Sequence, residues 1–225
     1  MQTADLTFHI IFSPRTARYL TPFIASLLKW SDCRYRIVAN ACTAEEVELL
    51  KNLASQEDRL EFLMFSETEL IEHGKTLSWL QKRCTDKYFC FMDSDIIATG
   101  PFMEKVGERL EHCDALCSGA PIWHAPEDLL VPTAFRRIQG SHLETDTGQC
   151  VASSYYMIFD NEKLNAALAV EGVDFPIAHF EDLPEPLQNT LRKVQLEKID
   201  YDTCKVIVGQ MNDQGARFEY LWLDN

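Results

Sequence analysis

The chain has 225 residues, of which 46% are apolar and 25% are charged, a composition typical of a globular domain and too apolar for a disordered chain. Acidic residues outnumber Lys and Arg by 35 to 21, so the formal net charge is −14. This excess argues against a nucleic-acid partner or an anionic membrane surface, because both are bound by dense clusters of Lys and Arg. No apolar run approaches the length of a membrane-spanning helix.

The eight cysteines are scattered, form no Cys-x-x-Cys pair and lie mostly inside apolar stretches, so we interpret them as small core residues kept in a reducing compartment. His112, Cys113 and Cys117 come nearest to metal-ligand spacing, but closed zinc sites usually bring four ligands in two clusters. The N-terminus lacks the basic and then apolar pattern of a signal peptide. We therefore expect a cytoplasmic protein.

Five short apolar segments in the first half predict buried β-strands, at residues 6–12, 35–39, 60–65, 88–92 and 114–118. Helices are predicted between them, because each gap carries a helix-start signal followed by apolar residues at helical spacing. These signals are the pair Thr21-Pro22, the capping boxes Thr43–Glu46 and Ser66–Glu69 (the latter helix interrupted at Gly74), and Gly100-Pro101.

The second half is less regular, and the many Pro and Gly residues of 119–149 predict loops around short helices. A strand is expected at 151–159, and a helical stretch begins near Glu181 and reaches about Ile199. Asp202 is expected to cap a last helix that Gly215 ends, and a closing strand follows at 218–223. We find no repeat or linker, so the chain is expected to form one domain over residues 1–225.

The alternation of strands and helices predicts an α/β fold with a mostly parallel sheet flanked by helices, since helical crossovers join parallel strands. Ligands of such sheets bind beyond the carboxyl ends of the strands. The loops that follow Phe12, Ala39, Phe65 and Met92 are therefore expected to converge on one site.

Two carboxylates follow the most apolar predicted strand, in the sequence Phe91-Met92-Asp93-Ser94-Asp95. Because side chains alternate along a strand, the i, i+2 spacing can place Asp93 and Asp95 on the same side. Two such charges repel each other unless a cation compensates, and carboxylate oxygens favour Mg²⁺ or Mn²⁺. The alternative interpretation is that both residues only cap the turn into the helix after Pro101.

This motif, after three strand–helix units, resembles the Asp-x-Asp motif of GT-A glycosyltransferases, most closely those of family 2. The resemblance covers residues 6–110 well. It implies the Rossmann-like GT-A fold of nucleotide-diphospho-sugar transferases, with Mn²⁺ or Mg²⁺ as cofactor. It further implies that residues 1–118 bind a nucleotide sugar, with UDP-sugars favoured, and that residues 119–225 form the acceptor side.

Two segments of the second half extend the resemblance. Phe180-Glu181-Asp182 resembles the Glu-Asp pair of the family, whose acidic member is the base on the acceptor side. Tyr201-Asp202-Thr203 resembles a Tyr-Asp-Thr-Gly segment, although Cys204 replaces the glycine. Many members add a later metal-binding His, whereas the last His here is His179. We expect that a C-terminal piece is missing or that waters and phosphates complete the metal shell.

The resemblance implies a role for each matching position. Ser13, Pro14 and Arg15 would hold the nucleoside, Asn40 would contact the base, and Lys75 would approach the diphosphate. Asp93 would contact the ribose and a metal-bound water, Asp95 would bind the metal directly, and Asp182 or Glu181 would be the base. Each polar residue has a structural alternative as a turn, cap or solvated surface residue. Aromatic and His side chains that are candidates for facing a sugar are Trp123, His124, Tyr155 and Tyr156.

The expected function is metal-dependent transfer of a sugar, with inversion, to a hydroxyl of a glycan, a lipid-linked or a small-molecule acceptor. The main alternative is an inactive nucleotide-sugar-binding domain. A nucleotidyltransferase would need a Gly-rich loop after the first strand, and Ser13–Thr16 contains no glycine. A phosphatase of the haloacid-dehalogenase type would carry its Asp-x-Asp motif on the first strand, with Thr or Val where Ile97 stands.

Overall fold

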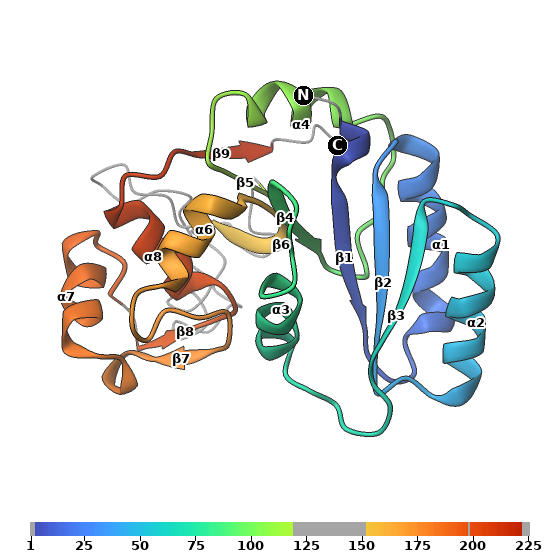
Figure 1. Ribbon diagram of the computed structural model, residues 1–225, viewed down its shortest axis with the longest axis horizontal. Coiled ribbons are helices and arrows are strands. Elements are labelled where there is room, and N and C mark those ends of the chain that lie inside the picture. Colours follow the sequence, from blue (N-terminus) through green and yellow to red (C-terminus); the bar gives the residue numbers. More distant parts are fainter. Residues whose placement is uncertain (1–2, 119–151, 198, 222–225) are drawn as a thin grey trace, which may run out of the picture.

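The computed structural model describes residues 3–118, 152–197 and 199–221. They contain a seven-stranded sheet with the strand order β3-β2-β1-β4-β6-β5-β9 (Figure 1). Four parallel strands form one side of it: β1 (Thr7–Phe12), β2 (Arg34–Asn40), β3 (Leu60–Ser66) and β4 (Tyr88–Met92).

The other side is mixed. Strand β6 (Ser153–Asp160) runs antiparallel between β4 and β5 (Ala115–Ser118), and β9 (Phe218–Leu221) is parallel to β5. All described strands of this sheet except β6 therefore run in one direction. The predicted fold class, a mostly parallel sheet flanked by helices, is confirmed.

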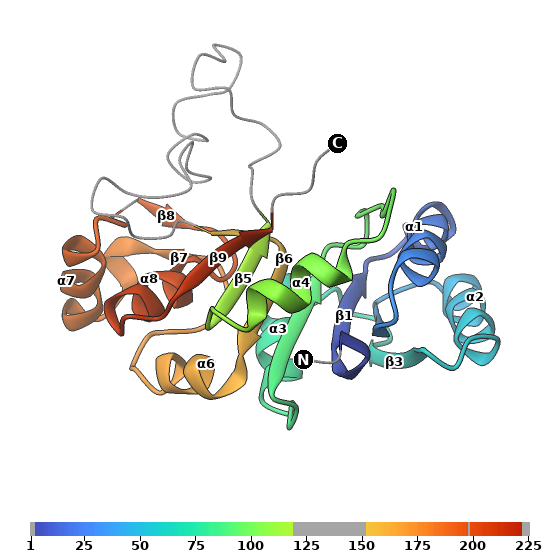
Figure 2. The ribbon, with the colours of Figure 1, turned by 90° about the horizontal axis from the view of Figure 1, so that it is seen from above.

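Helices cover both faces of the sheet, and each face has its own cluster of buried apolar side chains. One cluster packs α1 (Ala17–Trp30), α2 (Ala44–Ser55) and α4 (Met103–Leu110) against the sheet. The other packs α3 (His73–Gln81), α6 (Asn161–Leu168), α7 (Glu185–Lys193) and α8 (Lys205–Asp213). Figure 2 shows α1 and α2 at one end of the molecule and α7 and α8 at the other. None of the helices in the described ranges is long and apolar enough to span a membrane.

A second, two-stranded sheet lies beside α7 and α8. It pairs β7 (Ala178–His179) with β8 (Asp200–Tyr201) in antiparallel register, and the 3-10 helix η2 (Phe180–Asp182) follows β7 directly. A further 3-10 turn, η1 (Thr3–Asp5), precedes β1. The β7–β8 strand pair therefore brings together the segments that resemble the Glu-Asp pair and the Tyr-Asp-Thr segment.

The central strand β4 is buried on both faces, as its apolar sequence predicts. Phe89 and Phe91 belong to the cluster under α3, whereas Cys90 and Met92 belong to the cluster under α1 and α4. Because alternate residues share a face, the next side chain on the α3 face after Phe91 is that of Asp93. The strand therefore directs Asp93 toward α3.

Helix α1 begins at Ala17, so the prediction that it starts at Thr21-Pro22 is wrong. Pro22 lies inside the helix, where its ring removes one backbone hydrogen bond. Both ends of α1 are held by charged side chains from elsewhere in the chain. At the first end, Glu46 accepts hydrogen bonds from the backbone N–H groups of Arg15 (2.9 Å) and Ala17 (3.0 Å).

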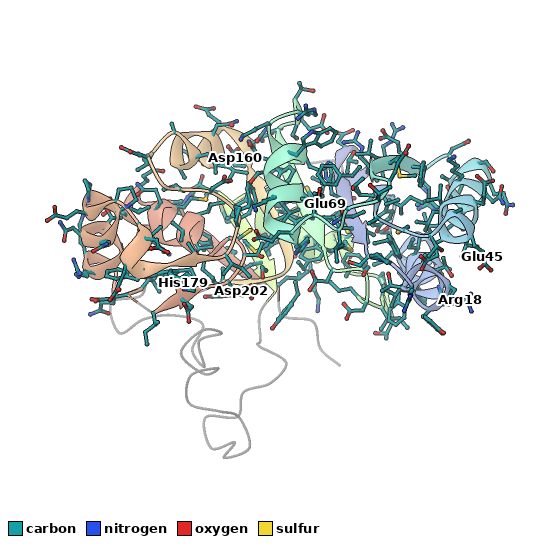
Figure 3. All side chains as sticks on the ribbon, turned by 90° about the horizontal axis from the view of Figure 1, so that it is seen from below. Arg18, Glu45, Glu69, Asp160, His179 and Asp202 are labelled. Carbon is teal, nitrogen blue, oxygen red and sulfur yellow. The ribbon has the colours of Figure 1, made fainter. Side chains whose placement is uncertain are left out.

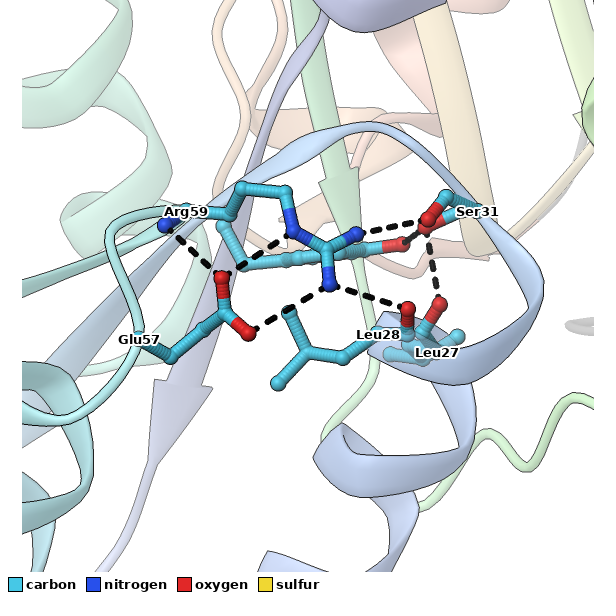
Figure 4. A network of polar contacts seen from close by, with 6 residues as sticks. Leu27, Leu28, Ser31, Glu57 and Arg59 are labelled. Carbon is cyan, nitrogen blue, oxygen red and sulfur yellow. Dashed lines mark hydrogen bonds and ion pairs between the residues drawn. The ribbon is translucent and has the colours of Figure 1, made fainter.

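At the other end, Arg59 donates to the carbonyl oxygens of Ser31 (2.6 Å) and Leu28 (3.0 Å), while Glu57 holds its guanidinium (Figure 4). A cation on the last carbonyls of a helix also interacts favourably with the helix dipole. These long-range contacts stabilise a helix whose boundaries the local sequence pattern does not show.

Glu46 also completes the predicted capping box of α2, which is confirmed: Thr43 and Glu46 exchange the two expected hydrogen bonds. Burial alone would raise the pKa of Glu46, but the hydrogen bonds donated by Arg15, Thr43 and Ala17 outweigh it and hold the pKa below its ordinary value. One carboxylate thus links the loop after β1 to the start of α2.

We expect Glu46→Gln to lower the free energy of unfolding by about 1–3 kcal/mol, because an amide has one acceptor oxygen in place of two and directs its NH₂ at donors. A depressed folded-state pKa gives stability above the unfolded-state pKa, and this stability is lost as pH falls through the folded-state pKa. The difference from wild type should therefore shrink below pH 4–5 (roughly the unfolded Glu range) in urea unfolding. Glu45→Gln, an exposed neighbour with the same charge change, should differ little; equal effects of both variants would contradict this role.

The second predicted capping box, Ser66–Glu69, is wrong, since no helix forms there and α3 starts at His73. The side chain of Asn40 instead holds this loop, donating to the carbonyl oxygen of Ile71 (2.7 Å) and accepting from its N–H (3.1 Å). Helix α3 also runs through Gly74 without the predicted interruption. Two later boundaries differ as well, because Gln195 and Cys204 have left-handed backbones: α7 ends at Lys193, and Cys204 in place of Asp202 precedes α8.

Candidate functional site

The two predicted metal ligands lie at the carboxyl edge of the sheet, directly after β4. The backbone N–H of Asp93 donates to the carbonyl oxygen of Tyr155 at 2.8 Å, which anchors this turn to the antiparallel strand β6. Asp93 is partly buried and Asp95 is exposed. The central strand thus holds one carboxylate in the protein and presents the other to solvent.

A third carboxylate, that of Asp202, joins this pair from the far end of the chain. Burial, Asp95 and Asp202 all raise the pKa of Asp93, which reaches about 7. In the part of the chain that the structure describes, the side chains of Asp93 and Asp95 have no hydrogen-bond or ion-pair partner. A partly buried carboxylate beside two like charges is costly unless a cation compensates it. The negative charges at this edge of the sheet therefore favour the binding of a cation.

His73, which no motif in the sequence indicates, also belongs to this site. Its ring lies edge-on to Phe91, with centroids 6.5 Å apart, so it is on the face of β4 that carries Asp93. Burial lowers the pKa of His73, against the opposing effects of the Asp202 and Glu72 carboxylates. The position of His73 depends on how α3 packs against β4, and the local sequence pattern does not show this packing.

The start of α3 is held in place by residues 174–177. Glu72 accepts a hydrogen bond from the N–H of Ile177 at 3.1 Å. A Cβ on Gly74 would lie 2.6 Å from the nitrogen of Pro176, so only glycine allows this approach. The carbonyl oxygen of Phe175 accepts from the N–H of Cys204 at 3.0 Å. This segment therefore connects α3 with the turn that carries Asp202.

The residues present fit a divalent cation only with help from a ligand. Within residues 3–118, 152–197 and 199–221, no group of three or more His, Cys, Asp or Glu side chains is gathered to hold a metal ion. Mg²⁺ is commonly bound by one or two carboxylates together with substrate phosphates and water. The unpartnered carboxylates of Asp93 and Asp95 match that pattern, in which phosphate and water oxygens complete the coordination.

The predicted nucleotide-binding residues lie in the loop after β1, at the last residue of β2 and at the start of α3. Ser13, Pro14 and Arg15 form the turn before α1, and Arg15 is exposed with a left-handed backbone (φ 69°). Asn40 is buried, and its amide is engaged by the backbone of the loop before α3. Lys75 is exposed, with its Nζ 3.7 Å from Glu72. Asn40 thus shapes this edge, while Arg15 and Lys75 present cations to solvent.

The predicted base residues, Glu181 and Asp182, lie in η2 and are exposed. Of the residues predicted to face a sugar, Trp123 and His124 lie outside the described ranges. The prediction for Tyr156 is wrong, because its ring is buried in the core, 5.1 Å from that of Phe8. Tyr155 is partly exposed.

Comparison with known proteins gives matches among solved structures, whereas no protein-family model and no curated protein sequence matches the chain. A mannosyltransferase from Pyrobaculum calidifontis, in complex with GDP-Man and Mn²⁺, is 14% identical over 88% of this chain and 54% of its own, with a TM-score of 0.53. A TarS fragment from S. aureus in complex with UDP-GlcNAc is 14% identical over 97% and 59%, with a TM-score of 0.53.

The galactosyltransferase LgtC, in complex with donor and acceptor sugar analogs, is 9% identical over 96% of this chain and 73% of its own, with a TM-score of 0.54. At such identities the likeness shows a shared fold. The chain spans little more than half the length of the first two of these structures.

Proposed function

We propose that this chain, which has the GT-A glycosyltransferase fold, transfers a sugar from a nucleotide-diphosphate donor to an acceptor hydroxyl with the help of Mn²⁺ or Mg²⁺. The observation that carries the proposal is the unpartnered carboxylate of Asp93, beside Asp95 and Asp202 at the carboxyl edge of the central strand. The solved structures of similar fold that were determined with GDP-Man and Mn²⁺ or with UDP-GlcNAc support it.

In this proposal Asp93 and Asp95 hold the divalent ion. When bound, the ion supplies positive charge that offsets the negative charge developing on the departing diphosphate. The loop of Ser13, Pro14 and Arg15 borders the nucleoside, and the Lys75 ammonium approaches the diphosphate. Asn40 shapes the part of the site proposed to bind the nucleobase, because its amide holds the loop before α3 through two hydrogen bonds to the Ile71 backbone. UDP is the favoured nucleotide.

The acceptor hydroxyl must lose a proton as its oxygen attacks the anomeric carbon, and direct displacement inverts that carbon. Resemblance to family 2 puts the proton acceptor in the segment that contains Glu181 and Asp182. The acceptor is proposed to be a glycan, a lipid-linked sugar or a small molecule.

A second candidate function is donor binding without turnover. The observation that favours it is that no three-ligand metal group lies within the described ranges. A metal site that depends on the diphosphate for most of its oxygens can bind the nucleotide without activating the sugar. Release of nucleotide from a sugar donor separates the two functions, because only the enzyme releases it catalytically.

We expect UDP to bind measurably in isothermal titration calorimetry with Mn²⁺ present and to bind far more weakly in EDTA, because two carboxylates repel a diphosphate without the ion. GDP, CDP and dTDP, titrated in the same way, report the base preference. Absence of binding for all four nucleotides with Mn²⁺ would contradict the proposed function.

A further inference from the structure

The β7–β8 strand pair holds a histidine and an aspartate against each other. His179 and Asp200 are directly opposite in the antiparallel register, and Nδ1 of His179 is hydrogen-bonded to the Asp200 carboxylate. In the neutral imidazole this contact makes Nδ1 the donor and leaves Nε2 as an unprotonated acceptor. The His179 side chain is largely exposed, so Nε2 is accessible to a ligand.

This pair lies next to the acidic edge of the sheet. Along β8 the buried Tyr201 faces the core, so strand alternation places Asp200 on the opposite side. Asp202 directly follows β8, two residues after Asp200, the residue that pairs with His179. In the projection of Figure 3 the two labelled residues, His179 and Asp202, are neighbours. Because Asp202 also raises the pKa of Asp93, the end of β8 lies near the proposed metal ligands.

The neighbouring acidic residues lack such an arrangement. Glu181 and Asp182 are exposed in η2, and within the described residues no hydrogen bond or ion pair of their side chains orients them. A general base works from a fixed position within hydrogen-bond reach of the proton, and an imidazole oriented by a carboxylate is a common form of it. These contacts therefore favour His179 over Glu181 and Asp182 as a general base.

We propose that Nε2 of His179 is the proton acceptor of the transfer reaction and that Asp200 is its positioning residue, an inference that rests on the proposed function. The acceptor oxygen forms its bond to the anomeric carbon while the bond from that carbon to the phosphate oxygen breaks. The electron pair of the broken bond leaves on the nucleotide diphosphate, and the hydroxyl proton passes to Nε2. Asp200 keeps the imidazole in the tautomer that can accept it.

A test that needs no turnover is modification of His179 by diethyl pyrocarbonate, followed by mass spectrometry. If Nε2 faces the transferred sugar, saturating UDP-GlcNAc with Mn²⁺ should slow the modification by about tenfold relative to UDP with Mn²⁺, as expected for a site almost fully occupied. GDP-mannose and GDP replace this pair if calorimetry selects the guanine nucleotide. His112, exposed beyond α4 at the opposite edge of the sheet, is the internal control. Equal modification of His179 in the two complexes would overturn the proposal.

A kinetic test compares His179→Ala, Asp200→Asn and Asp182→Asn by the release of UDP from UDP-GlcNAc. Loss of a general base lowers turnover by about 10²–10⁴-fold, and we expect this for His179→Ala with UDP and Mn²⁺ affinity unchanged. Added imidazole should restore part of the rate in that variant, and Asp200→Asn should lower turnover without weakening donor binding.

Loss of turnover in Asp182→Asn, with His179→Ala as active as wild type, would overturn the assignment and make the His179–Asp200 contact a surface ion pair. Failure of every nucleotide to bind wild type would instead overturn the proposed function, so the two failures are distinguishable.

Discussion

Replacing Asp95 with alanine is expected to weaken Mn²⁺-dependent UDP binding by about 100-fold or more. In other proteins, removing a residue that only supports a metal ligand lowers metal affinity by about 10–100-fold. Asp95 is proposed to be a ligand itself, so its removal should cost more. The loss should be large here because the described residues contribute few other ligands, so the site has little redundancy. Calorimetry at fixed Mn²⁺ measures it.

The matched control is Asp58→Ala, which removes the same charge from an exposed residue before β3, at the amino edge of the sheet. It should bind UDP like wild type, which separates a local effect from the change in net charge. Asp93→Asn should behave like Asp95→Ala. Wild-type affinity in Asp95→Ala, still lost on adding EDTA, would mean that the metal is held elsewhere and would contradict the assignment.

The second large effect is expected from Gly74→Ala, which should lower the free energy of unfolding by about 3 kcal/mol. The new methyl group would lie 2.6 Å from the nitrogen of Pro176 and 2.8 Å from the carbonyl carbon of Phe175, and both are backbone atoms that cannot rotate away. To accommodate it, α3 and residues 174–177 must separate, which also displaces His73 from Phe91. Urea unfolding measures the first effect.

Gly107→Ala is the matched control, since it also places a methyl group in a helix, here 3.5 Å from Cγ2 of Thr3 in ordinary contact. It should be neutral or stabilising by about 0.5–1 kcal/mol, because alanine loses less backbone entropy than glycine on folding. If the two variants unfold at the same urea concentration, the close approach of α3 to Pro176 is not a constraint on the fold.

Local patterns predict the elements best where they are strong and self-contained. The apolar run over 88–92 gives a strand buried on both faces, and the box from Thr43 to Glu46 caps α2 as expected. The similar box at Ser66 fails because Asn40, 31 residues from its partner Ile71, holds that loop out of a helix. The start of α1 is missed for the same kind of reason, since the carboxylate that holds it belongs to Glu46.

The sequence by itself determined a mostly parallel α/β sheet and the placement of Asp93 and Asp95 at the end of its central strand, because strand alternation and helix caps depend on neighbouring residues. Only the tertiary structure decided that Asp202 lies near both Asp93 and His73, and that His179 is paired with Asp200. Such groups come from separate elements, and their proximity depends on which strands pair and which helix faces pack. Such long-range contacts produce no periodic pattern of residues in the sequence.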